Sequence, residues 1–402
     1  MKILVLSAKS PWPPHDGGAI ATLRCIKGLM ENGASVSLMT MRTQKQTSPT
    51  LTDDQVISSL NYYKTVNIDT TIKPLDLFTN FIFSKEPYDL IRFRKRKFTE
   101  GLKTLLQRDS YDIIQCEGLV FSYYLEDIRS STSAPVVLRA HNVEHRIREM
   151  LAQRTEKKIK KVYLKNLADR IREREIWAAN QFDAVVPITK SDMEWFSDVA
   201  PGRPMLMMGT GVDELTNPAN VNINEQRVGF IGALDWQPNI DGLLWFLKEV
   251  WPYISKRMPS ASLHIAGRNA SEKVQKNLVG KNVVYEGEVR DSHIFTAAMS
   301  VMIAPLFAGS GMRIKIIEAM SLGKVTVATP VAAEGLPVTH RKDILIAEDK
   351  YMFSTAVIEV LSRPELRNEI STAACALIKK RFGNRELTSD LVGFYKTLIH
   401  DS

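Results

Sequence analysis

The sequence predicts an α/β protein with two doubly wound domains, each built on a parallel sheet. Short apolar runs of about five or six residues alternate with helical patterns along most of the chain, as expected for buried parallel strands joined by crossover helices. The alternation occurs in two series, and the second begins near residue 227. A length of 402 residues also favours two domains over a single core.

The first 40 residues are typical of one β-α-β unit. The run ILVLSA predicts a buried strand at 3–8, and SVSLMT predicts the next strand at 35–40. Between them, the loop KSPWPPHDGG precedes a helical pattern with one apolar stripe. Further strands are predicted at 112–116, 135–140 and 183–189, and a long charged helical region at about 143–180.

The second series predicts a strand at 227–232 and an amphipathic helix at 239–254. More strands follow at 262–267, 282–287, 300–305, 324–329 and 343–347. The join between the two series lies near the Pro- and Gly-rich stretch 201–211. Right-handed crossovers in both series predict two Rossmann-like domains, whose ligands bind at the carboxyl ends of the strands.

The composition is that of a soluble globular protein, and a net charge of +8 allows an anionic partner. Cys25, Cys116 and Cys375 form no paired motif, which favours a reduced compartment. The apolar start MKILVLSA is too short to span a bilayer, and no later segment is long and apolar enough. We therefore expect a cytoplasmic protein, and we leave open a peripheral contact with the inner face of the cell membrane.

The stretch FAGSGMRIKIIEAM, residues 307–320, joins a predicted strand to a predicted helix. Gly309 and Gly311 permit a close backbone approach, and free amides at the start of a helix favour an anion. Arg313 and Lys315 add positive charge at the same place. These features predict a phosphate site.

Glu318 follows about two turns into this helix, where a carboxylate would repel phosphate. A carboxylate can instead accept hydrogen bonds from the vicinal diol of a ribose. Phosphate at the loop and sugar hydroxyls at Glu318 together describe a nucleotide or a nucleotide-sugar. The alternative is a Gly-rich turn followed by a surface ion pair between Lys315 and Glu318.

Two other loops follow predicted strands. HDGG, residues 15–18, would present the amides of Gly17 and Gly18 at a helix start, or form only a tight turn. His141, in RAHNVEH, stands at the end of a strand, where it can donate a hydrogen bond or accept a proton. His145 follows four residues later, but no third ligand completes a zinc site, and a helix-capping network is the alternative.

Two basic runs, 91–98 and 156–165, are open to three interpretations. They can form solvated helix faces, contact anionic lipid, or bind nucleic acid. Acidic residues close by favour the solvated face, with lipid next and nucleic acid last.

Together these residues resemble the retaining glycosyltransferases of family 4, which have the GT-B fold of two Rossmann-like domains facing across a cleft. The resemblance spans nearly the whole chain, and its most specific part is APLFAGSGMRIKIIEAMSLGKVTVAT, 304–329. The first β-α-β unit, MGTGVD (208–213), VGFIGALDWQPNIDGLLWF (228–246) and VVYEGEVRD (283–291) also match. The tail FGNRELTSDLVGFYKTLI resembles the last helix of this fold, which crosses back to the first domain.

The resemblance implies an acceptor domain at 1–205 with the helix 385–402, and a donor domain at 206–384. The second Glu of the family's E-x7-E motif, which holds the ribose, falls at Glu318, whereas the first falls at Ser310. The family's Arg and Lys that clamp the diphosphate are absent, since Ala233 and approximately Asn239 occupy their positions, so Arg313 and Lys315 are expected to replace them.

The expected site residues fall into three groups. Those expected to be catalytic are His141, Arg313 and Lys315; the donor-binding ones are Gly18, Val289, Gly309, Ser310, Gly311, Met312, Arg313, Ile314, Lys315 and Glu318; the acceptor-binding ones are Gly17, Gly18 and His141.

The activity that the resemblance implies is retaining transfer of a sugar from a UDP-, GDP- or ADP-linked donor to a glycan or lipid-linked acceptor in surface polysaccharide synthesis. No metal, other cofactor or nucleic acid is expected. A nucleotide-sugar 2-epimerase with Glu117 as its acid–base group, a phosphorylase, and a non-catalytic nucleic-acid-binding protein are the alternatives.

Overall fold

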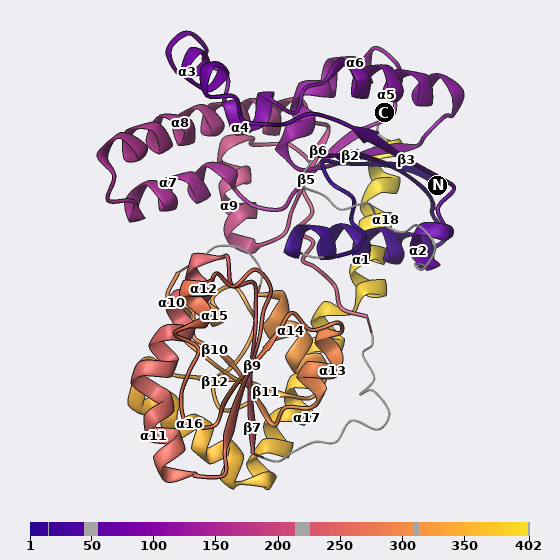
Figure 1. Cartoon of the computed structure of the whole chain (residues 1–402). Coiled ribbons are helices and arrows are strands. Elements are labelled where there is room, and N and C mark those ends of the chain that lie inside the picture. Colours follow the sequence, from indigo (N-terminus) through magenta and orange to yellow (C-terminus); the bar gives the residue numbers. More distant parts are fainter. Residues whose placement is uncertain (15, 44–54, 214–225, 309–312, 401–402) are drawn as a thin grey trace. The chain divides into compact units, whose positions relative to one another are not determined.

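The computed structural model describes residues 1–14, 16–43, 55–213, 226–308 and 313–400, and the chain divides into two compact units (Figure 1). Unit 1 consists of Met1–Gly211 and Asn384–Ser402, and unit 2 of Val212–Gly383. Within the described residues, each unit has a six-stranded parallel sheet with helices on both faces. The predicted α/β class with two Rossmann-like sheets is therefore confirmed.

The sheet of unit 1 has the strand order β3-β2-β1-β4-β5-β6, and all neighbouring strands are parallel. The order reverses between β1 and β4, so the crevice at their carboxyl ends is the place where such sheets bind ligands. The strands are β1 (Lys2–Ser7), β2 (Ser35–Arg42), β3 (Tyr62–Asn67), β4 (Ile113–Glu117), β5 (Val136–Ala140) and β6 (Ala184–Pro187).

Helices α1 and α18 cover one face of this sheet, where Ile26 and Tyr395 share a core. On the other face, α5, η1 and α8 contribute Phe98, Phe121 and Ile171 to a second core. The last helix, α18, thus belongs to unit 1, as the predicted fold requires. The helices are α1 (Gly17–Glu31), α2 (Gln55–Ser58), α3 (Pro74–Phe83), α4 (Tyr88–Ile91), α5 (Arg96–Arg108), the 3₁₀ helix η1 (Leu119–Tyr124), α6 (Leu125–Arg129), α7 (Glu144–Arg154), α8 (Lys158–Gln181), α9 (Lys190–Val199) and α18 (Asn384–His400).

Two elements of unit 1 differ from the sequence prediction. The charged helical region at 143–180 is two helices, α7 and α8, because the chain leaves the helical conformation at Thr155 and resumes it at Lys158. Strand β3 was not predicted. Its sequence, YYKTVN, lies at the edge of the sheet and is mostly half-buried, so it lacks the continuous apolar run that marks the inner strands.

The sheet of unit 2 has the order β12-β11-β10-β7-β8-β9, which repeats the topology of unit 1. Its order reverses between β7 and β10, and the crevice at their carboxyl ends is the second candidate site. The strands are β7 (Arg227–Ile231), β8 (Ser262–Ala266), β9 (Val283–Gly287), β10 (Val301–Ala304), β11 (Val325–Ala328) and β12 (Leu345–Ile346).

The predicted helix at 239–254 extends over 237–257 and contains one π-helical turn, η2. Pro252 lies just after this turn and has no amide hydrogen to donate, which explains the irregular hydrogen bonding. The helices of unit 2 are α10 (Gln237–Trp245), η2 (Phe246–Val250), α11 (Trp251–Arg257), α12 (Glu272–Gln275), α13 (Ser292–Ala297), α14 (Ile314–Ser321), α15 (Pro330–Ala333), α16 (Lys350–Ser362) and α17 (Pro364–Phe382).

Gly242 allows α10 to pack closely against the chain that leaves β10. A Cβ atom added at Gly242 would lie 1.7 Å from the carbonyl oxygen of Pro305, so one of the two backbones must move. We expect Gly242→Ala to lower the free energy of unfolding of unit 2 by about 3 kcal/mol, the upper range for overpacking. Urea unfolding measures this loss.

The matched control is Gly393→Ala in α18, where an added Cβ meets no atom within 4 Å. That change should leave stability unchanged or raise it by up to ~1 kcal/mol, because alanine is the better helix former. Equal effects of the two substitutions would contradict the close contact at Gly242.

Candidate active site

The crevice of unit 1 begins with the loop between β1 and α1. Lys9 extends its ammonium to the carboxylate of Asp16, with 2.5 Å between Nζ and Oδ1. Asp16 also caps α1 by accepting a hydrogen bond from the amide of Ala19. Gly17 and Gly18 are the first two residues of α1, and a Cβ added at Gly18 would lie 3.2 Å from Lys9 Nζ. The predicted glycine loop therefore adjoins a cation.

A cavity of about 790 Å³ opens at this edge of the sheet, within the size range of small-molecule sites. Gly18 and His141 both line it, whereas Gly17 is exposed and is not part of its wall. The wall carries both signs of charge. Its ionisable side chains are Lys9, Asp16, Asp89, Arg92, Glu117, His141, Glu144 and Arg148.

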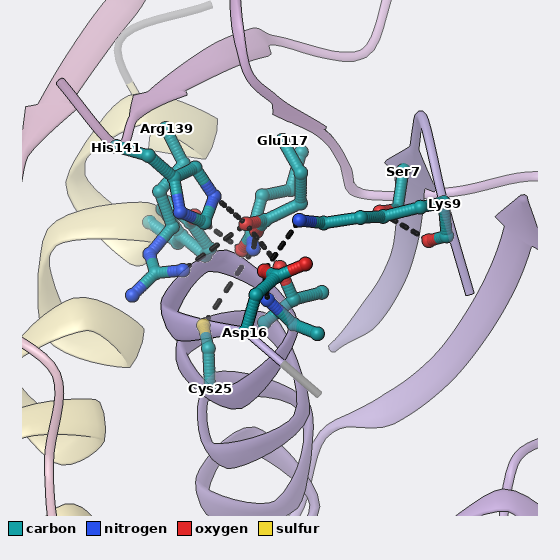
Figure 2. Close-up of polar contacts among 11 residues, drawn as sticks. Ser7, Lys9, Asp16, Cys25, Glu117, Arg139 and His141 are labelled. Atoms are coloured by element: carbon teal, nitrogen blue, oxygen red, sulfur yellow. Dashed lines mark hydrogen bonds and ion pairs between the residues drawn. The ribbon is translucent and has the colours of Figure 1, made fainter. Parts of the chain in front are cut away.

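Glu117, the last residue of β4, is the centre of a buried polar network (Figure 2). Its Oε2 accepts hydrogen bonds from Thr22 Oγ1 at 2.9 Å, Arg139 Nη1 at 3.1 Å and His141 Nε2 at 2.5 Å. Its Oε1 accepts a short hydrogen bond from Gln115, which in turn accepts one from the hydroxyl of Tyr395 on α18. The network thus ties the final helix to the cavity wall.

The charge balance of this network keeps Glu117 ionised. Burial alone would raise the pKa of Glu117, but the charge of Arg139 and the hydrogen bond from His141 outweigh it and lower this pKa to about 2. A carboxylate with such a low pKa is a poor proton acceptor near neutral pH. It serves instead to orient His141, because it accepts the hydrogen on Nε2.

His141 and His145 have different surroundings. His141 is partly exposed in the cavity, whereas His145 is buried, and its Nδ1 lies 2.7 Å from Oε2 of Glu175. Glu175 also accepts hydrogen bonds from the backbone amides of Glu144 and His145 at the start of α7. His145 therefore belongs to a helix-capping network, and no metal-binding cluster of His, Cys, Asp or Glu is found among the described residues.

In unit 2, the first turn of α14 approaches the start of α10, the helix that follows β7. Lys315, in the first turn of α14, donates a hydrogen bond of 3.0 Å to Oδ1 of Asn239, and its ammonium lies 4.9 Å from the centre of the Phe230 ring. Asn239 itself donates to the carbonyl oxygen of Ala233. The contact thus spans the crevice between β7 and β10, where the order of the strands reverses.

The environment of Lys315 disfavours its charge. Burial, with the nearby charge of Arg313 as the second cause, lowers the pKa of Lys315 to about 7. Arg313 is buried just before the helix, and burial lowers its pKa too, against the opposing charge of Glu334. Two neighbouring basic side chains whose pKa values are both lowered by burial are typical of a functional site.

Glu318 is the fifth residue of α14, so it lies about one turn into the helix, not two as predicted, because the helix begins at Ile314. Its Oε1 lies 3.9 Å from Nε2 of His293 at the start of α13. Val289 packs in the small cluster that also contains Ala319 of α14. Three of the predicted residues, Ile314, Lys315 and Glu318, therefore lie in α14, and Val289 packs beside this helix.

Four predicted donor-site residues lie outside the described part of the chain: Gly309, Ser310, Gly311 and Met312. The structure also places residues at the two crevices that the sequence did not single out as site residues. These are Lys9, Arg139 and Tyr395 in unit 1, and His293 in unit 2. Lys9 stands two residues after the end of β1, and Arg139 is a charged residue within the apolar strand β5, so the sequence pattern could have selected both.

Comparison with known proteins identifies the domain in unit 2. The family model described as glycosyl transferases group 1 matches residues 225–363, which contain β7 to β12 and α14. The chain therefore carries a group 1 glycosyltransferase domain. Its crevice between β7 and β10, with Lys315 and Glu318, lies inside the matched region.

The chain is similar over its whole length to solved GT-B structures. It matches sucrose-phosphate synthase from Thermosynechococcus elongatus with a TM-score of 0.70 at 16% identity, covering 100% of both chains. It matches Anabaena HepE, solved in complex with UDP and glucose, with a TM-score of 0.66 at 13% identity, covering 99% of this chain and 100% of HepE. These likenesses establish the GT-B fold.

A relative of similar length is an uncharacterized 44.6 kDa protein in the cps region of Klebsiella pneumoniae, 22% identical over 97% of this chain and 98% of its own. Among the described residues of the chain, no helix is long and apolar enough to cross a membrane.

Proposed function

We propose that this protein is a retaining glycosyltransferase of family 4 that transfers a sugar from a nucleoside-diphosphate sugar to a glycan or lipid-linked acceptor. The observation that carries the proposal is the position of Lys315, whose ammonium lies in the crevice between β7 and β10 of a group 1 glycosyltransferase domain. A half-buried cation in the first turn of a helix is suited to a diphosphate.

In this proposal Lys315 and Arg313 replace the Arg and Lys that the family pattern places at Ala233 and Asn239. The position of Lys315 supports this exchange. Its Nζ lies 3.0 Å from Oδ1 of Asn239, the residue that stands where the family pattern has a cation. Burial lowers the pKa of Lys315, and binding of a diphosphate would favour the charged form of this lysine.

Glu318 is assigned to the ribose of the donor. Its carboxylate lies one turn beyond the phosphate site, and the contact with His293 orients it from one side. Carboxylates accept hydrogen bonds from the vicinal hydroxyls of ribose in related sheets. Because HepE was solved with UDP and glucose, UDP-sugars are the first donors to test, followed by GDP- and ADP-sugars.

The transfer step follows from this arrangement. The bond between the anomeric carbon and the β-phosphate oxygen breaks, and its electron pair stays with the phosphate. The acceptor hydroxyl forms its bond to the anomeric carbon on the same face, and its proton passes to the departing phosphate oxygen. Arg313, Lys315 and the helix amides stabilise the charge that develops on the diphosphate, which lowers the barrier.

The cavity of unit 1 is the proposed acceptor site. Its walls alternate cations and carboxylates, such as the Lys9–Asp16 and Arg148–Asp89 pairs, and hydroxyl-rich ligands can hydrogen-bond to both kinds of group. His141 is held by Glu117 through Nε2, so the remaining ring atoms face a ligand in a fixed orientation. We assign His141 to the contact with the transferred sugar or the attacking hydroxyl.

The alternative functions have weaker support. A 2-epimerase needs a carboxylate that exchanges protons, and Glu117 is held ionised by Arg139. Nucleic-acid binding would use exposed aromatic rings among the cations of 91–98, but Phe98 is buried against Phe121 and Tyr124. No observation favours a phosphorylase.

Binding of UDP should weaken as the pH rises above about 7. Lys315 with a pKa of about 7 loses its charge above that pH in the free protein, whereas bound diphosphate raises this pKa. Binding is then coupled to proton uptake, and the affinity should fall by up to about tenfold per pH unit between pH 7 and 9. Calorimetric titration across this range measures the effect.

Lys315→Met serves as the control for this pH dependence. It should bind UDP weakly at every pH, with no slope between pH 7 and 9. A wild-type affinity that is constant over this range would remove Lys315 from the diphosphate site.

The reaction itself is tested by incubating the protein with UDP-, GDP- and ADP-sugars and a mixed set of glycan and lipid-linked acceptors. We expect one donor to release its nucleoside diphosphate in step with product formation, and proton NMR of the product to show the anomeric configuration of the donor. A product with the opposite configuration would contradict retention while leaving glycosyl transfer intact.

A further inference from the structure

Helix α3 presents an apolar stripe to solvent. None of its ten residues is buried, and Leu75 and Phe83 are 72% and 84% exposed. Leu75, Phe78 and Ile82 follow one another at helical spacing, so they lie on one side of the helix. An amphipathic helix normally buries such a stripe, and a contiguous exposed one indicates an interaction surface.

The start of α8 extends this apolar surface. Arg170 of α8 donates hydrogen bonds to the carbonyl oxygens of Asn80 and Phe81 at the end of α3, and the ring of Phe81 lies 5.8 Å from that of Tyr163. Ile159 precedes Tyr163 by one turn, is 89% exposed, and therefore lies on the same side of α8 as α3. Figure 1 shows α3 close to α8 within unit 1.

Exposed lysines surround the apolar groups. Five of them occupy the last residue before α8 and its first two turns, and two more lie just before and just after α3. Glu156 and Asp76 are the acids in the same two segments, so the surface is positively charged. The seven lysines are Lys73, Lys85, Lys157, Lys158, Lys160, Lys161 and Lys165.

An apolar stripe bordered by lysines fits the boundary between the headgroups and acyl chains of an anionic bilayer, where the stripe enters the apolar region and the ammonium groups meet lipid phosphates. A nucleic acid would match the lysines but would leave the leucine and isoleucine side chains in water. We propose that α3 and the first two turns of α8, the docking face, bind unit 1 to an anionic membrane surface.

The docking face continues into the cavity of unit 1. Ile72 stands two residues before α3, is 51% exposed, and also lines the cavity together with Thr70 and Thr71. A membrane bound to the docking face therefore lies next to one rim of the cavity. If the proposed function holds, this position favours an acceptor whose polar part enters the cavity while its lipid stays in the bilayer.

The test is co-sedimentation of the full chain with vesicles of phosphatidylcholine alone and with 30% phosphatidylglycerol, without any donor or acceptor. Wild type should bind the anionic vesicles at least tenfold more strongly, and high salt should weaken this binding. Phe78→Glu and Leu75→Glu should each reduce it by about tenfold or more. The matched control is Val279→Glu, which changes an apolar residue of unit 2 that is 69% exposed, and it should bind as wild type does.

Other outcomes would overturn the docking face. Equal binding to neutral and anionic vesicles, or unchanged binding by Phe78→Glu, would do so. If the wild type fails to bind vesicles, light scattering decides whether the face binds a second copy of this chain. A wild-type dimer together with a Phe78→Glu monomer would assign the face to that second copy. UDP binding is measured on the same variants, so failure of the docking face is distinguished from failure of the donor site.

Discussion

Lys315→Met should lower the rate of sugar transfer by about 10²–10³-fold, the usual loss when a donor that stabilises transition-state charge is removed. The same change should raise the melting temperature of the ligand-free protein. Burial lowers the pKa of Lys315 from its ordinary 10.5 to about 7. Between pH 7 and 10.5 the unfolded chain therefore binds more protons than the folded chain, so the need to discharge this lysine opposes folding near neutral pH. A residue that destabilises the fold and yet is needed for turnover is one retained for function.

The kcat for transfer and the melting temperature are measured on the same preparations. Lys324→Met is the matched control, because burial also lowers the pKa of Lys324. Lys324 is buried just before β11, at the opposite end of the strands from the crevice. This variant should gain stability without losing activity. Wild-type turnover in Lys315→Met would refute the replaced phosphate clamp.

Glu117→Gln should lower the free energy of unfolding by about 3–5 kcal/mol, the range for breaking a buried ion pair at one partner. Both side chains of the Glu117–Arg139 pair are almost fully inaccessible, so the variant leaves the charge of Arg139 without its counter-ion. The change also removes the acceptor that orients His141. Guanidinium unfolding gives the stability loss, and Glu100→Gln, from an exposed pair with Arg96, should cost about 0.5 kcal/mol or less.

Two further measurements separate the charge of Glu117 from its packing. The pKa of Glu117 is about 2 in the folded protein and 4.5 in the ordinary carboxyl, so its contribution is complete above pH 4.5 and is lost as the pH falls toward 2. This loss should be absent in Glu117→Gln. The double variant with Arg139→Met should be more stable than Glu117→Gln alone, and a strictly additive result would contradict the ion pair.

The sequence was sufficient to predict the inner strands, because each is a short apolar run flanked by polar turns. It was insufficient for β3, whose half-buried residues alternate too weakly, and for the break at Thr155, since the residues around it form helices as readily as their neighbours. The π turn before Pro252 also depends on how a proline is accommodated within a packed helix. These failures all concern elements that are defined by tertiary packing rather than by local pattern.

For the site, the position of a residue after a strand led to the choice of His141 and Lys315, and their roles stay predictions. Their partners were not predictable, because Glu117 and Asn239 are separated from them in sequence by 24 and 76 residues, and only the sheet topology brings them together. The different roles of His141 and His145 likewise depend on Glu117 and Glu175, which come from other elements. The donor role of Gly309 to Met312 stays a prediction.

The central claim, that unit 2 binds a nucleoside-diphosphate sugar at α14, is tested most directly by the melting temperature of the protein with UDP-, GDP- and ADP-sugars. A ligand at 100 times its Kd stabilises the native state by about 2.7 kcal/mol, which is a shift of several degrees. We predict such a shift for at least one donor, with a strongly reduced shift in Glu318→Gln and Lys315→Met. No shift with any donor at millimolar concentration, or an equal shift in both variants, would contradict the claim.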